Sequence, residues 1–129
     1  MALSTDVESF KFWDVVTLWA RERLEHEDIV ASALARAIIR DGLKFQSIDT
    51  RWGDKKEIEF KGDPFVGFAA KPGEAVMVLR ADVLEHLLAI VRTAQKASRK
   101  ILKNEFVLKT DFKEWLDKTG QSLPSFWFS

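Results

Sequence analysis

Residues 92–103 form the densest run of side chains that could do chemistry in this 129-residue sequence. The stretch RTAQKASRKILK carries five Lys or Arg and no acid, in a chain whose formal net charge is zero. A row of cations can contact nucleic-acid phosphates, and each contact releases counterions and strengthens binding at low salt. The candidate contacts are Arg92, Lys96, Arg99, Lys100 and Lys103, with Lys55 and Lys56 in a predicted hairpin turn.

An amphipathic helix is the element that would present these cations together. Asp82, with Glu85 three residues later, has the form of a helix start, and the apolar pattern predicts a long helix reaching about Leu102. At roughly 100° per residue, the five cations fall within an arc of roughly 100°. Acids at the start of a helix and bases at its end also suit the macrodipole. We therefore expect a solvated helix end first, with a nucleic-acid contact or an acidic protein partner as alternatives.

The charges of the chain are unevenly distributed, although they cancel overall. Residues 1–30 hold seven acids against three bases, and residues 92–109 hold six bases against one acid. Such oppositely charged segments can pair within one chain or with a second copy of it.

Catalytic and metal-binding patterns are absent from the sequence. His26 and His86 are the only histidines and have no metal-ligand spacing, and there is no cysteine. There is also no G-x-S-x-G, phosphate-binding loop or dinucleotide motif. We expect no catalytic residue, no cofactor and no metal, and a protein that is not an enzyme.

The aromatic side chains suggest a second kind of contact. Five Trp and ten Phe occur without a Tyr, and the chain closes on QSLPSFWFS. Chain ends fray unless they are tied down, so residues 121–129 either pack on their own domain or dock on another chain. We favour packing within the domain. The docking anchors in the second case would be Leu123, Phe126, Trp127 and Phe128.

This ending also resembles known sequences. DFKEWLDKTGQSLPSFW is similar to the C-termini of small, mostly uncharacterised bacterial, phage or plasmid proteins, in which an aromatic-W helix, a Gly and an LP-x-F element close the chain. The resemblance covers roughly the last sixth of the sequence. It implies a bacterial or mobile-element origin and no particular activity.

The length and composition predict a single α+β domain over residues 1–129, with residues 1–9 frayed. Two helices, over about 10–24 and 28–41, precede a small, mostly antiparallel sheet. Its strands are predicted in KFQSID, EIEF, PFVGFA and AVMVL, the last as the central strand, with a possible short strand in FVL. The long helix packs on this sheet, and a short helix from Asp111 to Gly120 follows. A winged-helix-like arrangement is an alternative, although the second helix is too apolar to suit a DNA-reading helix.

The leading functional prediction is a non-enzymatic binding or regulatory module that acts through protein contacts, including self-association as a homodimer. Nucleic-acid binding through the basic stretch is the alternative. The N-terminus has no signal-peptide pattern and no apolar run is long enough to span a bilayer, so we expect a cytoplasmic protein without membrane contact.

Overall fold

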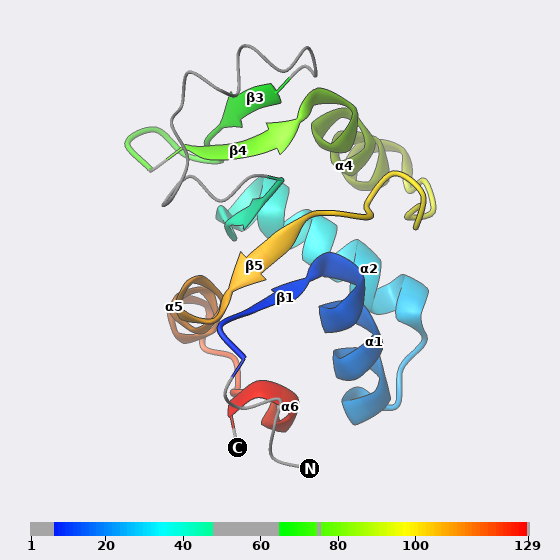
Figure 1. The fold of residues 1–129 in the computed structure, drawn as a ribbon, viewed down its shortest axis with the longest axis vertical. Helices are drawn as coiled ribbons and strands as arrows, with labels where there is room; N and C mark the ends of the chain where they lie inside the picture. Colours follow the sequence, from blue (N-terminus) through cyan, green and yellow to red (C-terminus); the bar gives the residue numbers. More distant parts are fainter. Residues whose placement is uncertain (1–6, 48–64, 75, 129) are drawn as a thin grey trace.

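The computed structural model describes residues 7–47, 65–74 and 76–128. Its elements form two small antiparallel sheets and a set of helices, which confirms the predicted α+β class (Figure 1). The strands are β1 (Ser9–Lys11), β2 (Phe45–Gln46), β3 (Phe65–Phe68), β4 (Met77–Arg80) and β5 (Phe106–Leu108). The helices are α1 (Phe12–Arg23), α2 (Glu27–Arg36), the π-helical η2 (Ala37–Asp41), α4 (Ala81–Thr93), α5 (Lys109–Thr119) and α6 (Ser125–Phe128).

Figure 1 shows the β3–β4 hairpin and α4 at one end of the molecule, and α5 and α6 at the other. Between them lie α2 and the sheet of order β1-β5-β2. None of the helices in these described ranges combines the length and apolarity of a transmembrane span.

The first two helices agree with the sequence pattern. In α1 the buried side chains recur at three- and four-residue steps, which gathers them against the core. The chain leaves α1 through Leu24, in the left-handed conformation with φ 55°. His26 caps α2, where its Nδ1 accepts a hydrogen bond from the Asp28 backbone N–H. The second helix continues as one wider turn in η2 and ends at Gly42, whose φ of 75° favours glycine.

The β3–β4 hairpin confirms the predicted pairing of PFVGFA with AVMVL. Its turn has Pro72 and then Gly73 with φ 85°, and the Glu74 N–H donates to the Lys71 carbonyl, as a type II turn requires. In the other predicted hairpin, KFQSID contains β2, which pairs with β5, whereas the turn and EIEF lie outside the described residues.

The strand predicted from AVMVL is not the central strand of the three-stranded sheet. The middle strand of that sheet is β5, from the short FVL segment, and among the described residues β4 pairs along its length with β3. The two sheets meet at Ser47, whose N–H donates to the Val78 carbonyl over 2.9 Å. Burial alternates along β4, so this strand buries one face rather than both.

The predicted long helix from Asp82 to Leu102 is also wrong. It starts one residue earlier, with Arg80 as N-cap, and ends at Thr93, after which Ala94 turns the backbone into the left-handed region with φ 56°. The turn lets the following segment fold back onto the helix, so that Ala97 and Leu102 become buried. The burial of Ala97 and Leu102 stabilises the folded chain more than a longer helix would.

A buried ionic network joins β2, β4 and the segment before β5. Glu105 is only 1% exposed, and its Oε2 accepts from the Ser47 hydroxyl at 2.9 Å and from Arg80 Nε at 3.4 Å. Arg80 also donates through Nη2 to the Ile101 carbonyl at 2.6 Å. A buried carboxylate is tolerated because it is paired and hydrogen-bonded.

The aromatic tail packs on its own chain. Trp127 is fully buried and its Nε1 donates to the Val7 carbonyl over 2.7 Å. Its ring lies 4.7 Å from that of Phe10 and 5.5 Å from that of Phe112, between centroids. At the N-terminal end, Lys109 N–H donates to the Glu8 carbonyl, so residues 7–9 are held by backbone and tail together. Residues 1–6 of the predicted frayed end lie outside the described residues.

Candidate binding groove

The cations of the basic stretch do not share one helical face. Only Arg92 belongs to α4, and the other four follow it in a segment without helical structure. Two of them turn toward the start of α2. Arg99 Nη2 lies 3.1 Å from each carboxylate oxygen of Glu27, and Lys96 Nζ lies 3.5 Å from Asp28 Oδ2.

Glu27, Asp28, Lys96 and Arg99 form what we call the charge cluster. The Arg99 guanidinium also lies over the Trp13 ring, 4.4 Å from its centroid. The hydrogen bond from the Thr17 hydroxyl at 2.7 Å, together with Arg99, holds the pKa of Glu27 below its ordinary value. The acidic and basic segments of the sequence therefore pair within one chain.

Arg92, Lys100 and Lys103 remain exposed and form no ion pair with any residue in the described ranges. Lys55 and Lys56 lie outside those ranges. Nucleic-acid contact through the basic stretch stays a prediction, and three of its five cations remain unpaired for it.

His86 serves the fold of the segment after α4. It is 5% exposed, and its Nε2 accepts from the Ser98 backbone N–H at 2.9 Å. Burial lowers the pKa of this imidazole, and the nearby Asp82 only partly opposes the effect. Within the described residues, no group of three or more His, Asp or Glu side chains could hold a metal ion.

Three neighbouring cavities extend from α5 to residues 121–124, and we call them together the Trp groove. The end pocket, of about 230 Å³, shares Asp41 and Trp115 with the central pocket, of about 390 Å³. The central pocket in turn shares Trp19, Arg23 and Gln121 with the tail pocket, of about 310 Å³. The shared residues place the cavities next to one another.

Two tryptophans form the floor of this groove. Trp19 of α1 and Trp115 of α5 meet edge to face, with ring centroids 6.2 Å apart. Both belong to the core and are less than 10% exposed, so each offers a fixed aromatic edge to the cavities. The Trp115 indole is oriented by a 3.3 Å hydrogen bond from its Nε1 to Asp41 Oδ2.

One wall is the outer face of α2. Ile29, Ala33 and Arg36 line the central pocket at four- and three-residue steps, and all three are exposed. Ile29 is 56% exposed, which is unusual for a large apolar side chain in a small domain.

The opposite wall comes from the end of α1 and from residues 121–124. Arg23 lies over the Trp19 ring at 5.4 Å and pairs with Glu25 at 3.4 Å. Leu123, one of the predicted docking residues, lines the tail pocket and is 41% exposed. The other three predicted anchors belong to α6, where Trp127 is buried and Phe126 and Phe128 are half-buried.

The start of α6 is fixed against the same wall. The Glu22 carboxylate accepts from the backbone N–H groups of Ser125 and Phe126 and from the Ser125 hydroxyl, over 2.8 to 3.0 Å. This cap anchors Leu123 and Pro124 beside the tail pocket.

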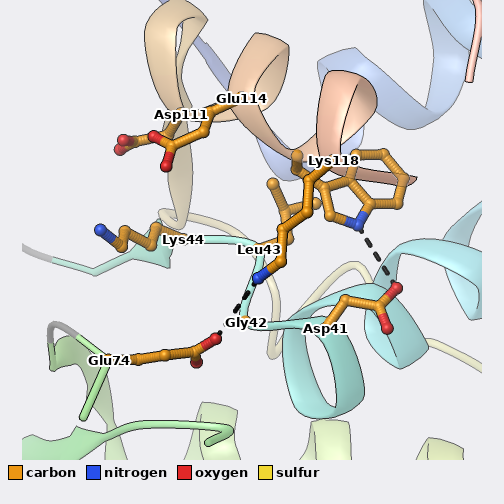
Figure 2. Close-up of a pocket in the computed structure, with 9 residues that line it drawn as sticks. Asp41, Gly42, Leu43, Lys44, Glu74, Asp111, Glu114 and Lys118 are labelled. Carbon is orange, nitrogen blue, oxygen red and sulfur yellow. Dashed lines mark hydrogen bonds and ion pairs between the residues drawn. The ribbon is translucent and has the colours of Figure 1, made fainter. Parts of the chain in front are cut away.

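Six of the nine residues that line the end pocket are charged (Figure 2). Asp111 and Glu114 project from α5 above it, and Lys118 reaches across to Glu74, with 3.5 Å between Nζ and Oε1. Glu74 lies directly on Gly42, where an added Cβ would come within 2.5 Å of Oε2.

Of the residues that line the groove, the sequence predicted only Leu123 as a contact. Trp19 and Trp115 belong to the core and also line the groove. Arg36 is exposed on α2 together with Ile29 and Ala33. The available signal was Ile29 itself, four residues before Ala33 and seven before Arg36.

Comparison with protein-family models, curated proteins and solved structures finds no match to this chain.

Proposed function

We propose that the protein is a binding module that acts through contacts with another protein, and that the Trp groove is its contact surface. The observation that carries this proposal is the position of the exposed apolar side chains. Among the described residues four large ones are exposed, and Ile29 and Leu123 line the groove. The other two, Leu24 and Val76, line none of the three pockets. Exposed apolar groups gathered in one place mark interaction sites.

The composition of the groove supports the same function. Trp and Arg are the residues most often found at the energetic centres of protein interfaces, and here two Trp edges form the floor between Arg23 and Arg36. The aromatic rings are already buried and held, so binding would cost little additional side-chain ordering.

Self-association has less support than a different partner. The opposite charges that suggested it are paired within the chain at Arg99 and Glu27, and Trp127 is buried in its own core. Neither feature is left over for a second copy.

A peptide library displayed on phage tests the proposal. Selection on the intact chain should return peptides that bind it, and Ala33→Trp, which fills the central pocket from the α2 side, should weaken their binding at least about tenfold. Lys113→Trp places the same bulk on an exposed position of α5 outside the groove, and should leave binding unchanged. Peptides that bind Ala33→Trp as well as the parent, or no enriched peptide at all, would contradict the proposal.

A further inference from the structure

The charged side chains that line the central pocket differ in whether they already have an ion-pair or hydrogen-bond partner. Four of its lining residues carry charge: Arg23, Glu25, Arg36 and Asp41. Glu25 is paired with Arg23, and Asp41 accepts the Trp115 indole N–H. Arg36 makes no ion pair or side-chain hydrogen bond with any residue in the described part of the chain. The Arg36 guanidinium is therefore the charged group of this pocket that has no partner among the described residues. A guanidinium offers five hydrogen-bond donors and binds carboxylates in bidentate fashion.

In the central and tail pockets, the acids are held by donors of this chain. Glu22, in the tail pocket, already accepts three hydrogen bonds from the start of α6. The Arg23–Glu25 pair is exposed, and such pairs contribute little, about 0–1 kcal/mol. Arg23 can therefore turn to a partner's carboxylate at small cost, whereas Glu22 cannot turn to a partner's cation without uncapping α6. These two pockets complement an acidic segment better than a basic one.

The spacing along α2 limits how such a segment can lie. Ile29 and Ala33 are one turn apart and form the apolar part of the wall, and Arg36 lies at the far end. Seven residues of helix place Ile29 and Arg36 about 10 Å apart along the axis. In an extended chain, at about 3.3 Å per residue, three residues cover the same distance.

The occupant is an extended chain because of the size of the cavities. The central pocket, of about 390 Å³, has room for a few side chains. A helix with its side chains is about 10–12 Å wide, so its backbone would stay at the rim and only its side chains would enter, whereas an extended chain can lie in the pocket along its length.

We propose that the partner binds as an extended, acidic segment, which places an apolar side chain against Ile29 and Ala33 and a carboxylate, three residues away, against Arg36. This inference rests on the proposed function, since it names the chemistry of the partner at the same groove. It is a case of peptide recognition in which one apolar anchor gives affinity and one charge pair gives register.

The test uses a randomised dodecapeptide library selected on the intact chain. The enriched peptides should share an apolar residue with Asp or Glu three positions away. Arg36→Glu should weaken their binding at least about tenfold, because it replaces an attraction with a repulsion. A peptide with Lys in place of that acid should recover binding to Arg36→Glu. Arg40→Glu is the matched control, because Arg40 is exposed four residues further along and does not line the pocket, so this variant should bind like the parent.

The outcomes separate this inference from the proposed function. Peptides that are blocked by Ala33→Trp but carry no fixed acid, or bind Arg36→Glu undiminished, would overturn the acidic segment and leave the groove as a binding site. Peptides that ignore Ala33→Trp would overturn both.

Discussion

The charge cluster and the Trp groove flank the same helix and differ in what they leave unsatisfied. At the start of α2, Glu27 and Asp28 are paired with Arg99 and Lys96. Further along the helix, Ile29, Ala33 and Arg36 line the central pocket. Arg36 forms no ion pair with any described residue. In the first region all four charges are paired, whereas the second leaves exposed apolar side chains and an Arg without an ion pair among the described residues.

This difference shows that charge density along a sequence is a weak guide to a contact surface. The most basic stretch of the chain supplies two of its five cations to an intramolecular contact. The groove is marked instead by exposed apolar side chains and one unpaired Arg, features that appear only once the fold decides what is covered.

The largest difference in stability is expected within the tail, where Trp127 belongs to the core and Leu123 belongs to the wall of the groove. Replacing the fully buried Trp127 with Ala should lower the free energy of unfolding by about 3–5 kcal/mol, because it leaves a large cavity. Leu123→Ala removes a side chain that is 41% exposed and should cost less than about 1 kcal/mol. Urea unfolding followed by fluorescence measures both. Equal losses would mean that the tail is one structural unit.

Arginines in the two regions should differ by a smaller amount. Arg99→Ala removes both oxygen contacts to Glu27 and the position over Trp13, and should cost about 1 kcal/mol of unfolding free energy. Arg36→Ala should change stability by less than about 0.5 kcal/mol. A double-mutant cycle of Arg99→Ala with Glu27→Gln isolates the pair. A coupling energy near zero would show that the charge cluster contributes nothing.

The segment that carries Lys96 and Arg99 should weaken as the pH falls. Burial lowers the pKa of His86 in the folded protein, so the unfolded chain takes up its proton first, near pH 6.5. The stability due to neutral His86 is complete above pH 6.5 and is lost as the pH falls from there toward the lowered folded value. Asp82, Gln95 and Ser98 are the polar groups near the ring.

Urea midpoints at pH 7.5 and 5.5 check this dependence. His86→Gln should be less stable than the parent and should lose less between the two pH values, whereas the control His26→Asn, which keeps a capping side chain on α2, should lose as much as the parent. The range stays above the interval where Glu27 contributes, because the lowered pKa of that carboxyl places its loss below pH 4.5. An unchanged slope in His86→Gln would assign the pH dependence to another group.

The smallest effect is expected for nucleic acid. With Lys96 and Arg99 paired internally, labelled duplex DNA should show little change in anisotropy at about 50 mM salt. The opposite outcome is strong binding that falls steeply at about 200 mM salt and is lost when three exposed cations, Arg92, Lys100 and Lys103, are together replaced by Glu. It would make the basic stretch, rather than the Trp groove, the main contact surface.

The sequence predicted those elements whose signal is local. The periodicity of α1, the apolar α2 ended by Gly42 and the Pro-Gly turn of the hairpin all follow from neighbours a few positions apart. It did not predict β1, because three residues form a strand there only by pairing with β5, far along the chain.

The end of α4 could not be read for a related reason. Ala94 is exposed and Ala97 is buried, since the backbone turns to let Ser98 reach His86. The groove was missed because a helix face looks the same in sequence whether or not another element covers it.

The bond from Trp127 to Val7, which joins positions 120 residues apart, has a consequence for how the chain is made. Translation delivers the N-terminal strand first, yet its partner β5 and the indole that closes over it come last. A ribosome-bound chain that stops short of residue 127 leaves Phe10 and Phe112 without the ring that lies beside both. The part of the core around Phe10 and Phe112 is therefore complete only after residue 127 has been synthesised.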